Sequence, residues 1–178
     1  MLKYSVGAAV STILRKVALL KDLDDQALAK VWNICRLQEY ESGSVIMREG
    51  ESGDSMYFFV EGTVDVTKSM TLKLDTGSNS RVEKSMVVLK APAVSIFGEM
   101  AMLENEPRSA TITANSHCVL YQVDRQDFTE LCNEDPQLGL QLLRGIAGIM
   151  SGRIRKTSED KLKLSTALSL ALTKQTGV

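Results

Sequence analysis

Two residues of opposite charge stand close together in the segment from Phe97 to Thr111. Glu99 follows a glycine in the run Phe-Gly-Glu-Met-Ala-Met-Leu, and after three further residues Arg108 follows a proline in the run Pro-Arg-Ser-Ala-Thr. A guanidinium offers a planar fork of N–H donors that suits anionic oxygens, whereas a carboxylate only accepts hydrogen bonds. Arg108 is therefore a candidate anion-binding group and Glu99 a candidate hydrogen-bond acceptor, although an ion pair between two surface strands is an alternative interpretation.

The rest of the chain offers little for catalysis or metal binding. His117 is the only histidine, so it has no histidine partner for a metal, and no Ser-His-Asp or Cys-His set can be built without it. Cys35, Cys118 and Cys132 are odd in number, far apart and without a CxxC pair, which argues against a disulfide framework and a zinc or iron–sulfur site. We expect no catalytic residue, no metal ligand and reduced thiols in a cytoplasmic protein.

Short strands are expected between residues 37 and 123. Runs of β-branched or aromatic residues separated by glycine-rich turns occur at Met56–Val60, Gly62–Val66, Met86–Leu89 and Val119–Val123. Valines at 64 and 66 alternate with polar residues, as in an antiparallel sheet with one face against a core. The glycines at 43, 50, 53 and 62 stand where strands should end, and the run from Asp75 to Arg81 is typical of a polar hairpin loop.

Helical periodicity replaces this pattern on both sides. Apolar residues recur at three- and four-residue steps from Ser5 to Arg36, with a break and a new N-terminal cap among Asp22, Asp24 and Asp25. After Val123 the periodicity returns, with Pro136 near the first turn of a helix that runs at least to Ile154. The tail, residues 157–178, could extend this helix or pack back.

The predicted fold class is therefore α+β. It has N-terminal helices over residues 1–36, an antiparallel, jelly-roll-like β-roll of about eight strands over 37–123, and C-terminal lid or dimerisation helices, one of them long, over 124–178. We expect the segment 97–111 to lie within the roll.

The ordered residues of the roll resemble the cyclic-nucleotide-binding domain family, which includes the catabolite activator, protein kinase A regulatory subunits and cyclic-nucleotide-gated channels. In the first half the resemblance rests on Gly43-Ser-Val-Ile46, Glu49-Gly50-Glu51-Ser52-Gly53-Asp54, Tyr57 and Gly62-Thr-Val64. In the second half, 97–111 is similar to the family's phosphate-binding cassette without a gap. The preceding segment, residues 89–96, lacks the paired glycines that are common in the family, so its loop path should differ.

The resemblance implies a role for each polar group of the cassette. Arg108 would bind the exocyclic phosphate oxygens, and Glu99 would accept the ribose 2′-hydroxyl. Residues 100–103 would form one helical turn whose unpaired N–H groups point at the phosphate. The implied ligand-binding set is Gly98, Glu99, Met100, Ala101, Arg108, Ser109 and Ala110.

Ser109 bears on the choice of base. Many kinase-type members of the family that are selective for cyclic AMP have alanine at this position, and threonine there is associated with cyclic GMP. A serine at this position is similar to the bacterial activators, which favour cyclic AMP. Its hydroxyl both donates and accepts, so it could serve the phosphate or a guanine amino group. We expect cyclic AMP to be favoured over cyclic GMP, and no other cofactor.

Two apolar stripes are predicted along the helix after Pro136. One consists of Leu138, Leu142, Ile146 and Ile149, and the other of Leu143, Ala147, Met150 and Ile154. Gly145, Gly148 and Gly152 flank the first stripe, although each helix-interior glycine costs about 1 kcal/mol relative to alanine. We expect close approach by a partner helix in a homodimer, or room for the purine under the helix. A weak helix that the ligand releases is the alternative.

Length and charge restrict the remaining functions. The chain of 178 residues suits one domain with helical appendages. Its 21 basic and 22 acidic residues give a net charge of −1, which supplies no field for attracting nucleic acid. No apolar run approaches the ~20 residues of a membrane span, and the stretch from Val6 to Leu14 is too diluted by polar residues for a secretory signal.

We therefore predict a non-enzymatic sensor that binds a cyclic nucleotide and signals to a downstream protein partner by rearranging its flanking helices. An interaction scaffold without ligand remains an alternative. So does a truncated transcription regulator of the catabolite-activator type, although no convincing helix-turn-helix follows Val123. A phosphodiesterase is disfavoured, because hydrolysis of a cyclic phosphate normally needs metal ligands.

Overall fold

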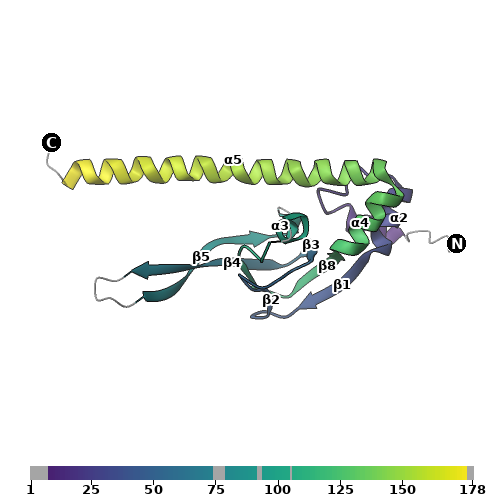
Figure 1. The fold of residues 1–178 in the computed structure, drawn as a ribbon, viewed down its shortest axis with the longest axis horizontal. Helices are drawn as coiled ribbons and strands as arrows, with labels where there is room; N and C mark the ends of the chain where they lie inside the picture. The colour runs from purple at the N-terminus through teal and green to yellow at the C-terminus, as the bar shows by residue number, and fades with distance from the viewer. Residues whose placement is uncertain (1–7, 74–78, 92–93, 105, 176–178) are drawn as a thin grey trace. The chain divides into compact units, whose positions relative to one another are not determined.

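The computed structural model describes residues 8–73, 79–91, 94–104 and 106–175. The chain divides into two compact units, Met1–Gly139 and Leu140–Val178. Within the described residues the first unit contains two sheets, four helices and the start of a fifth helix, whose remainder makes up the second unit (Figure 1). The ligand-binding residues predicted from the sequence all belong to the first unit.

Two N-terminal helices, α1 (Ala8–Leu14) and α2 (Asp25–Asn33), are separated by a tight connection. Asp24 is the N-cap of α2, and its Oδ1 accepts a hydrogen bond of 2.8 Å from the Ala27 amide. Such a cap satisfies one of the amides that have no partner inside a helix. The predicted break and cap are thus confirmed. Arg15 reinforces the connection by donating to the carbonyls of Lys21 and Leu23, both at 2.9 Å.

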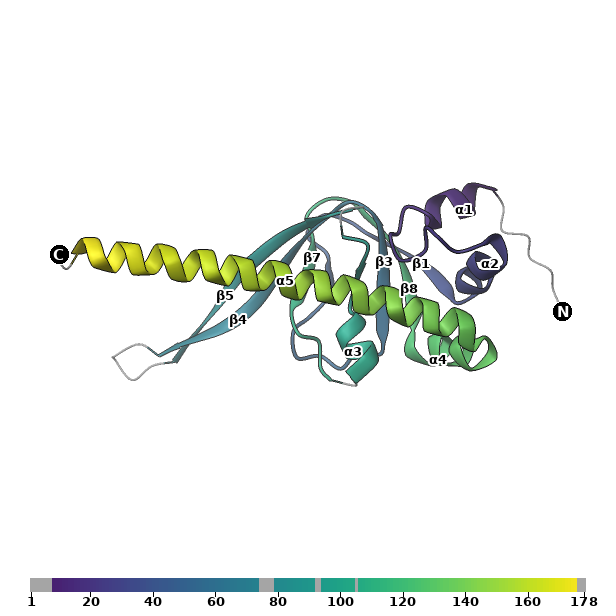
Figure 2. The ribbon, with the colours of Figure 1, turned by 90° about the horizontal axis from the view of Figure 1, so that it is seen from above.

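The first sheet has the order β1-β8-β3-β6. Its strands are β1 (Cys35–Tyr40), β8 (Cys118–Asp124), β3 (Ser55–Glu61) and β6 (Ile96–Phe97), and every neighbouring pair is antiparallel. Strands far apart in sequence are therefore adjacent, with β8 between β1 and β3. Seen from above, α1, α2 and α4 gather at one end of the roll, away from the β4–β5 hairpin (Figure 2).

The second sheet has the order β2-β7-β4-β5. Its strands are β2 (Val45–Met47), β7 (Thr111–Ala114), β4 (Thr63–Lys73) and β5 (Asn79–Lys90), again antiparallel. The eight described strands and flanking helices confirm the predicted α+β roll. The loop expected from Asp75 to Arg81 was too long, because Asn79 and Arg81 pair with Lys73 and Thr71. Residues 74–78 lie outside the described part of the chain.

The core of the roll is formed by inward side chains of both sheets. It contains Ile46, Tyr57, Phe59, Val64, Phe97, Ile112, Ala114, Cys118 and Leu120. The turn between β3 and β4 needs Gly62, which has a φ of 110° and whose added Cβ would lie 2.5 Å from the His117 carbonyl oxygen. His117 itself lies immediately before β8.

Two further helices follow the roll, α4 (Arg125–Glu134) and α5 (Pro136–Gln175). Pro136 is the first residue of α5, as predicted, since its fixed φ suits this position and its missing amide is not needed there. Asp135 precedes it; one carboxylate oxygen accepts from the Leu138 amide at 3.0 Å, and the other pairs with Lys30 Nζ at 2.6 Å. The beginning of α5 is thus fixed to α2.

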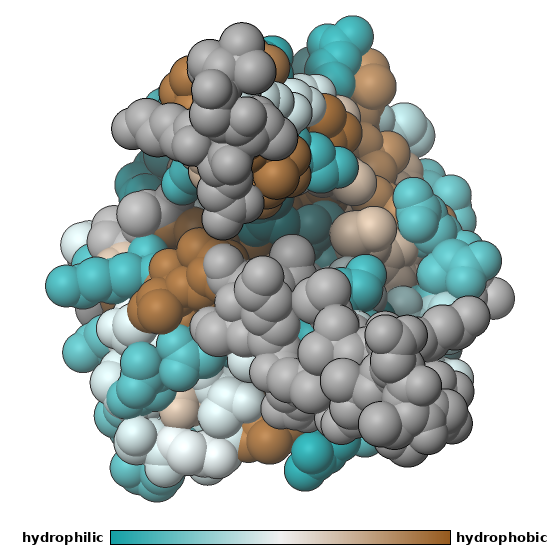
Figure 3. Space-filling model, turned by 90° about the vertical axis from the view of Figure 1, so that its left-hand side faces the viewer, coloured by the Kyte–Doolittle hydropathy of each residue, from teal (hydrophilic) through white to brown (hydrophobic). Residues whose placement is uncertain are grey.

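The second unit is a single helical segment, and the tail extends the helix rather than packing back. Its large exposed apolar side chains past residue 150 are 54–70% accessible; they are Ile154, Leu162, Leu164, Leu168, Leu170 and Leu172. Hydrophobic and polar side chains are both visible on the face that Figure 3 shows. None of the described helices is both long enough and apolar enough to span a membrane.

Candidate ligand-binding site

The cassette begins where the core ends. Phe97 is buried and packs edge-on against Phe59 with ring centroids 5.7 Å apart. Gly98 then turns the chain with a φ of 82°, in the region that glycine adopts most readily. A Cβ on Gly98 would lie 2.8 Å from Arg108 Nη1 and 3.1 Å from the Ser55 carbonyl oxygen. Only glycine therefore fits between the core and the arginine.

Arg108 is almost completely buried, with 6% of its surface exposed. Its Nη1 donates to the carbonyl oxygens of Ser55 at 2.6 Å and Gly98 at 3.2 Å, and its Nη2 donates to Ser55 Oγ at 3.0 Å. Its Cζ also lies 6.0 Å from the centre of the Tyr57 ring, within the range of a cation–π interaction. The guanidinium is therefore held in one position by β3 and by the turn before α3.

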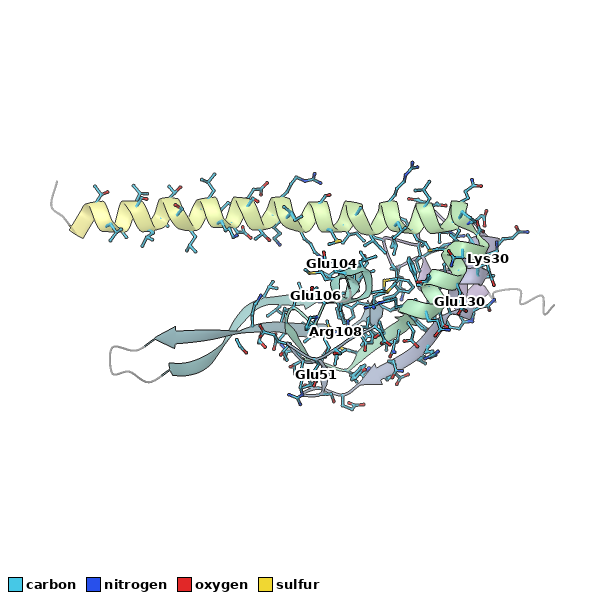
Figure 4. All side chains as sticks on the ribbon, viewed as in Figure 1. Lys30, Glu51, Glu104, Glu106, Arg108 and Glu130 are labelled. Atoms are coloured by element: carbon cyan, nitrogen blue, oxygen red, sulfur yellow. The ribbon has the colours of Figure 1, made fainter. Side chains whose placement is uncertain are left out.

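The backbone around Arg108 is paired with the loop between β2 and β3. The Arg108 amide donates to the Glu51 carbonyl and its carbonyl accepts from the Gly50 amide, both at 2.9 Å. The same loop approaches the side chain, because a Cβ on Gly53 would lie only 2.1 Å from Arg108 Nε. In Figure 4, Arg108 and Glu106 are labelled in the middle of the view, with Glu104 above them and Glu51 below.

Glu99 begins α3 (Glu99–Glu104) and is 4% exposed. The predicted helical turn over residues 100–103 is confirmed by this helix. An ion pair between two surface strands is ruled out for Glu99 and Arg108, because Glu99 lies in a helix and both side chains are buried. A buried carboxylate at a helix N-terminus is favoured by the helix dipole.

The remaining predicted ligand residues lie around these two. Ala101 is buried, Ala110 is half-buried, and Met100 and Ser109 are exposed. All seven residues lie between the end of β6 and the start of β7. Together they offer a buried cation, a buried acceptor and the N-terminus of a short helix.

Arg125, the first residue of α4, was not predicted to belong to the site. Its amide donates to the Asp54 carbonyl at 2.6 Å, and its Nη2 donates to the carbonyls of Gly53, at 3.3 Å, and Ala101. It thereby links α4 to both the β2–β3 loop and the cassette helix. Ser55 was also missed, and nothing in its local sequence marks it, since its contact depends on how distant strands pair.

A cavity of about 280 Å³ borders the cassette and is lined by Ser52, Gly53, Asp54, Glu106 and Pro107. Its two carboxylates make it unsuited to an anion, because like charges repel. Among the described residues, no group of three or more His, Cys, Asp or Glu side chains could hold a metal ion.

The cysteines are free and do not resemble reactive thiols. Burial raises the pKa of the Cys35 thiol to about 12 and raises the pKa values of Cys118 and Cys132 as well. Because the thiolate is the reactive form, these side chains act as small apolar groups.

A family model described as cyclic nucleotide-binding domain matches residues 37–135. The chain belongs to this family. The matched region of this cyclic-nucleotide-binding domain covers nearly all of the roll together with α4, and it includes the whole cassette. The resemblance seen in the ordered glycines and in residues 97–111 is thereby confirmed.

Three known proteins illustrate the likeness. The cAMP-dependent protein kinase regulatory subunit of Dictyostelium discoideum is 33% identical over 125 residues, which cover 70% of this chain and 36% of that protein. Human cGMP-dependent protein kinase 2 is 31% identical over 163 residues, covering 89% of this chain and 20% of the kinase. The chain therefore spans only about a third of the length of the first of these relatives and a fifth of the length of the second. A crystal structure of a cyclic nucleotide-binding domain from Methylobacillus flagellatus has a TM-score of 0.71 and 22% identity, covering 86% of this chain and 80% of the other.

Proposed function

We propose that this domain binds cyclic AMP in preference to cyclic GMP and acts as a sensor without catalytic activity. The observation that carries the proposal is the buried guanidinium of Arg108, held at one position beside the turn into α3. Burying a cation is costly unless an anion or several hydrogen bonds compensate it. A bound phosphate would complete this compensation, which gives the site affinity for an anionic ligand.

The other groups suit the remaining parts of a cyclic nucleotide. Glu99 is buried at the start of α3 and would accept the ribose 2′-hydroxyl, while Gly98 leaves space beside it. The amides of Ala101, Ser109 and Ala110 would donate to the phosphate, as amides at helix N-termini commonly do. Ser109 is exposed, so its hydroxyl is accessible to the ligand.

Isothermal titration calorimetry with each nucleotide tests this proposal. We expect binding of both, with the smaller Kd for cyclic AMP, and a rise in the thermal unfolding temperature because the ligand binds only the folded state. No heat and no thermal shift with either nucleotide would instead favour a ligand-free scaffold. Incubation with the domain should return cyclic AMP intact.

The proposed output is a rearrangement of the flanking helices. Arg125 joins α4 to the cassette helix and to the β2–β3 loop, so a shift of α3 on phosphate binding would be transmitted to α4. A ligand changes such an equilibrium only by binding one helix arrangement more tightly than the other. The output would then reach a downstream protein partner in the cytoplasm.

We further propose a homodimer through α5. Leu168 and Leu172 stand five helical turns beyond Met150 and Ile154 and so continue the second apolar stripe predicted from the sequence, and Leu164 lies one turn before Leu168. All three leucines are exposed. Exposed leucines on one side of a long helix are typical of a helix–helix contact. Within the described part of this helix, no neighbouring side chain lies within 4 Å of a Cβ added to Gly148 or Gly152, so these positions permit close approach.

Sedimentation velocity tests the dimer. The double variant Leu164→Lys/Leu168→Lys should sediment as a monomer, because two lysines on each helix would face each other. Leu162 is 69% exposed but lies two residues from Leu164 and hence on the opposite side of the helix. Leu162→Lys is therefore the matched control and should remain dimeric. A monomeric wild-type domain, with and without cyclic AMP, would contradict the proposal.

From Pro136 to Gln175 the chain forms one unbroken helix, so this described stretch contains no helix-turn-helix.

A further inference from the structure

We propose that Ser55 is a positioning residue for the phosphate of the nucleotide. In this interpretation, which rests on the proposed function, Ser55 holds one end of the Arg108 guanidinium so that the opposite edge faces the ligand. Ser55 is the first residue of β3 and 4% exposed. It contacts the arginine twice, through its carbonyl oxygen at 2.6 Å and its hydroxyl oxygen at 3.0 Å.

The donors of Arg108 divide into two groups. A guanidinium has five N–H donors in a fixed planar fork. Among the contacts found within the described residues, both N–H groups of Nη1 and one of Nη2 are used by Ser55 and Gly98. The Nε–H and the second N–H of Nη2 remain, and they lie side by side along one edge. Two parallel donors are what the two exocyclic oxygens of a cyclic phosphate require.

Gly53 packs closely against this second edge. The Cβ that any other residue would carry here lies 2.1 Å from Nε and 2.8 Å from Nη2, the two atoms of the remaining edge. Ser55 thus fixes the arginine from one side, and on the other side only glycine avoids a collision with the guanidinium. Both residues come from the same short stretch of chain, so this stretch determines how the guanidinium is presented.

The sheet makes Ser55 a rigid support. It pairs with Asp124 of β8, and the preceding residue, Asp54, accepts a hydrogen bond of 2.6 Å from the Arg125 amide. An arginine held in its binding geometry before the ligand arrives loses less side-chain freedom on binding. The Ser55 hydroxyl should therefore contribute to nucleotide affinity although it does not touch the nucleotide.

A double-mutant cycle with calorimetry of cyclic AMP binding tests this role. Ser55→Ala removes the hydroxyl and keeps the carbonyl, and we expect about a tenfold larger Kd, equivalent to about 1.4 kcal/mol. Arg108→Lys abolishes the fork, so adding Ser55→Ala to it should cause no further loss. Ser95 is also 4% exposed, and Ser95→Ala is the matched control for loss of a buried hydroxyl; its Kd should stay close to that of the wild type.

The outcomes separate this inference from the proposed function. If the wild type binds cyclic AMP and Ser55→Ala binds equally well, the inference alone is wrong. The inference is also overturned if Ser55→Ala lowers the affinity for cyclic AMP equally in the wild-type and Arg108→Lys backgrounds, because Ser55 would then act through the fold. If the wild type does not bind cyclic AMP, both proposals fail. If Ser55→Ala unfolds at a lower temperature than the wild type without ligand, Ser55→Cys replaces it as the test variant. Cysteine keeps the side-chain volume but is a weaker hydrogen-bond acceptor, so Ser55→Cys should show a similar loss of affinity for cyclic AMP.

Discussion

Replacing Gly53 by alanine should impair nucleotide binding while leaving the fold intact. The added Cβ would lie 2.1 Å from Arg108 Nε and 2.5 Å from Cζ, far inside the ordinary contact distance that begins at 3.4 Å. The guanidinium would have to retreat by more than about 1 Å, which destroys the geometry of paired charge-assisted hydrogen bonds. Each such bond contributes about 1.5–3 kcal/mol, so we expect a Kd for cyclic AMP roughly 10- to 150-fold larger.

The fold should tolerate this change. Gly53 does not have a φ in the left-handed region, so alanine introduces no backbone strain. The clashing atoms belong to the far end of a flexible side chain, which can move. Alanine also restricts the conformations of the unfolded chain, which offsets about 0.4–1 kcal/mol of any decrease in the free energy of unfolding. The unfolding temperature without ligand should therefore change by only a few degrees.

Calorimetry and thermal unfolding should be measured on the same samples. Ser52→Ala is the matched control, because Ser52 is exposed in the same loop and its replacement should leave Kd unchanged. If Gly53→Ala bound cyclic AMP within twofold of the wild type, the close packing of Gly53 against Arg108 would have no role in the binding site. That result would refute the reasoning.

Three further predictions concern other parts of the domain. Glu99→Gln should raise the Kd of cyclic AMP roughly tenfold but leave that of 2′-deoxy-cyclic AMP unchanged in competition binding; an equal loss for both would contradict the ribose role. Arg125→Met removes two contacts to carbonyls, so cyclic AMP should no longer slow amide exchange in α4; undiminished protection would disprove the link. The Lys30 hydrogen bond and the Leu138 amide hold the pKa of Asp135 below its ordinary value of 3.8. The ionised Asp135 carboxylate therefore stabilises the folded state fully above pH 3.8, the pKa of the unfolded chain. This contribution is lost as the pH falls through the lower pKa that Asp135 has in the folded state. Asp135→Asn should be less stable than the wild type in urea at neutral pH, and the difference should vanish in acid; a difference independent of pH would contradict this.

Local patterns were sufficient to predict most of the architecture. Alternation around Val64 and β-branched runs such as Val119–Val123 predicted strands that the structure contains. Asp24 and Pro136 predicted helix beginnings because capping and the fixed φ of proline depend only on a few neighbouring residues. The residues of the cassette were likewise found because they are contiguous in the sequence.

Features that depend on pairing between distant segments were not predictable. The contact between Ser55 and Arg108 requires β3, the β2–β3 loop and the cassette to meet, and no local pattern encodes this. Gly53 was interpreted as a turn glycine, yet its small size serves the arginine. The hairpin loop was placed too far toward β5, because pairing with β4 draws polar residues such as Asn79 into a strand.

The position of β8 between β1 and β3 has a consequence for how the domain is made. β1 is among the earliest strands of the roll to be synthesised, whereas its partner β8 is the last. Because a ribosome adds about 5–20 residues per second, β1 waits for several seconds with the backbone N–H and C=O groups of its β8-facing edge unpaired. Closing such a long loop is slow, and the unpaired edge exposed meanwhile favours aggregation. Chains that stop before residue 118 should therefore be insoluble, and during translation this domain should depend on chaperones until β8 has left the ribosome.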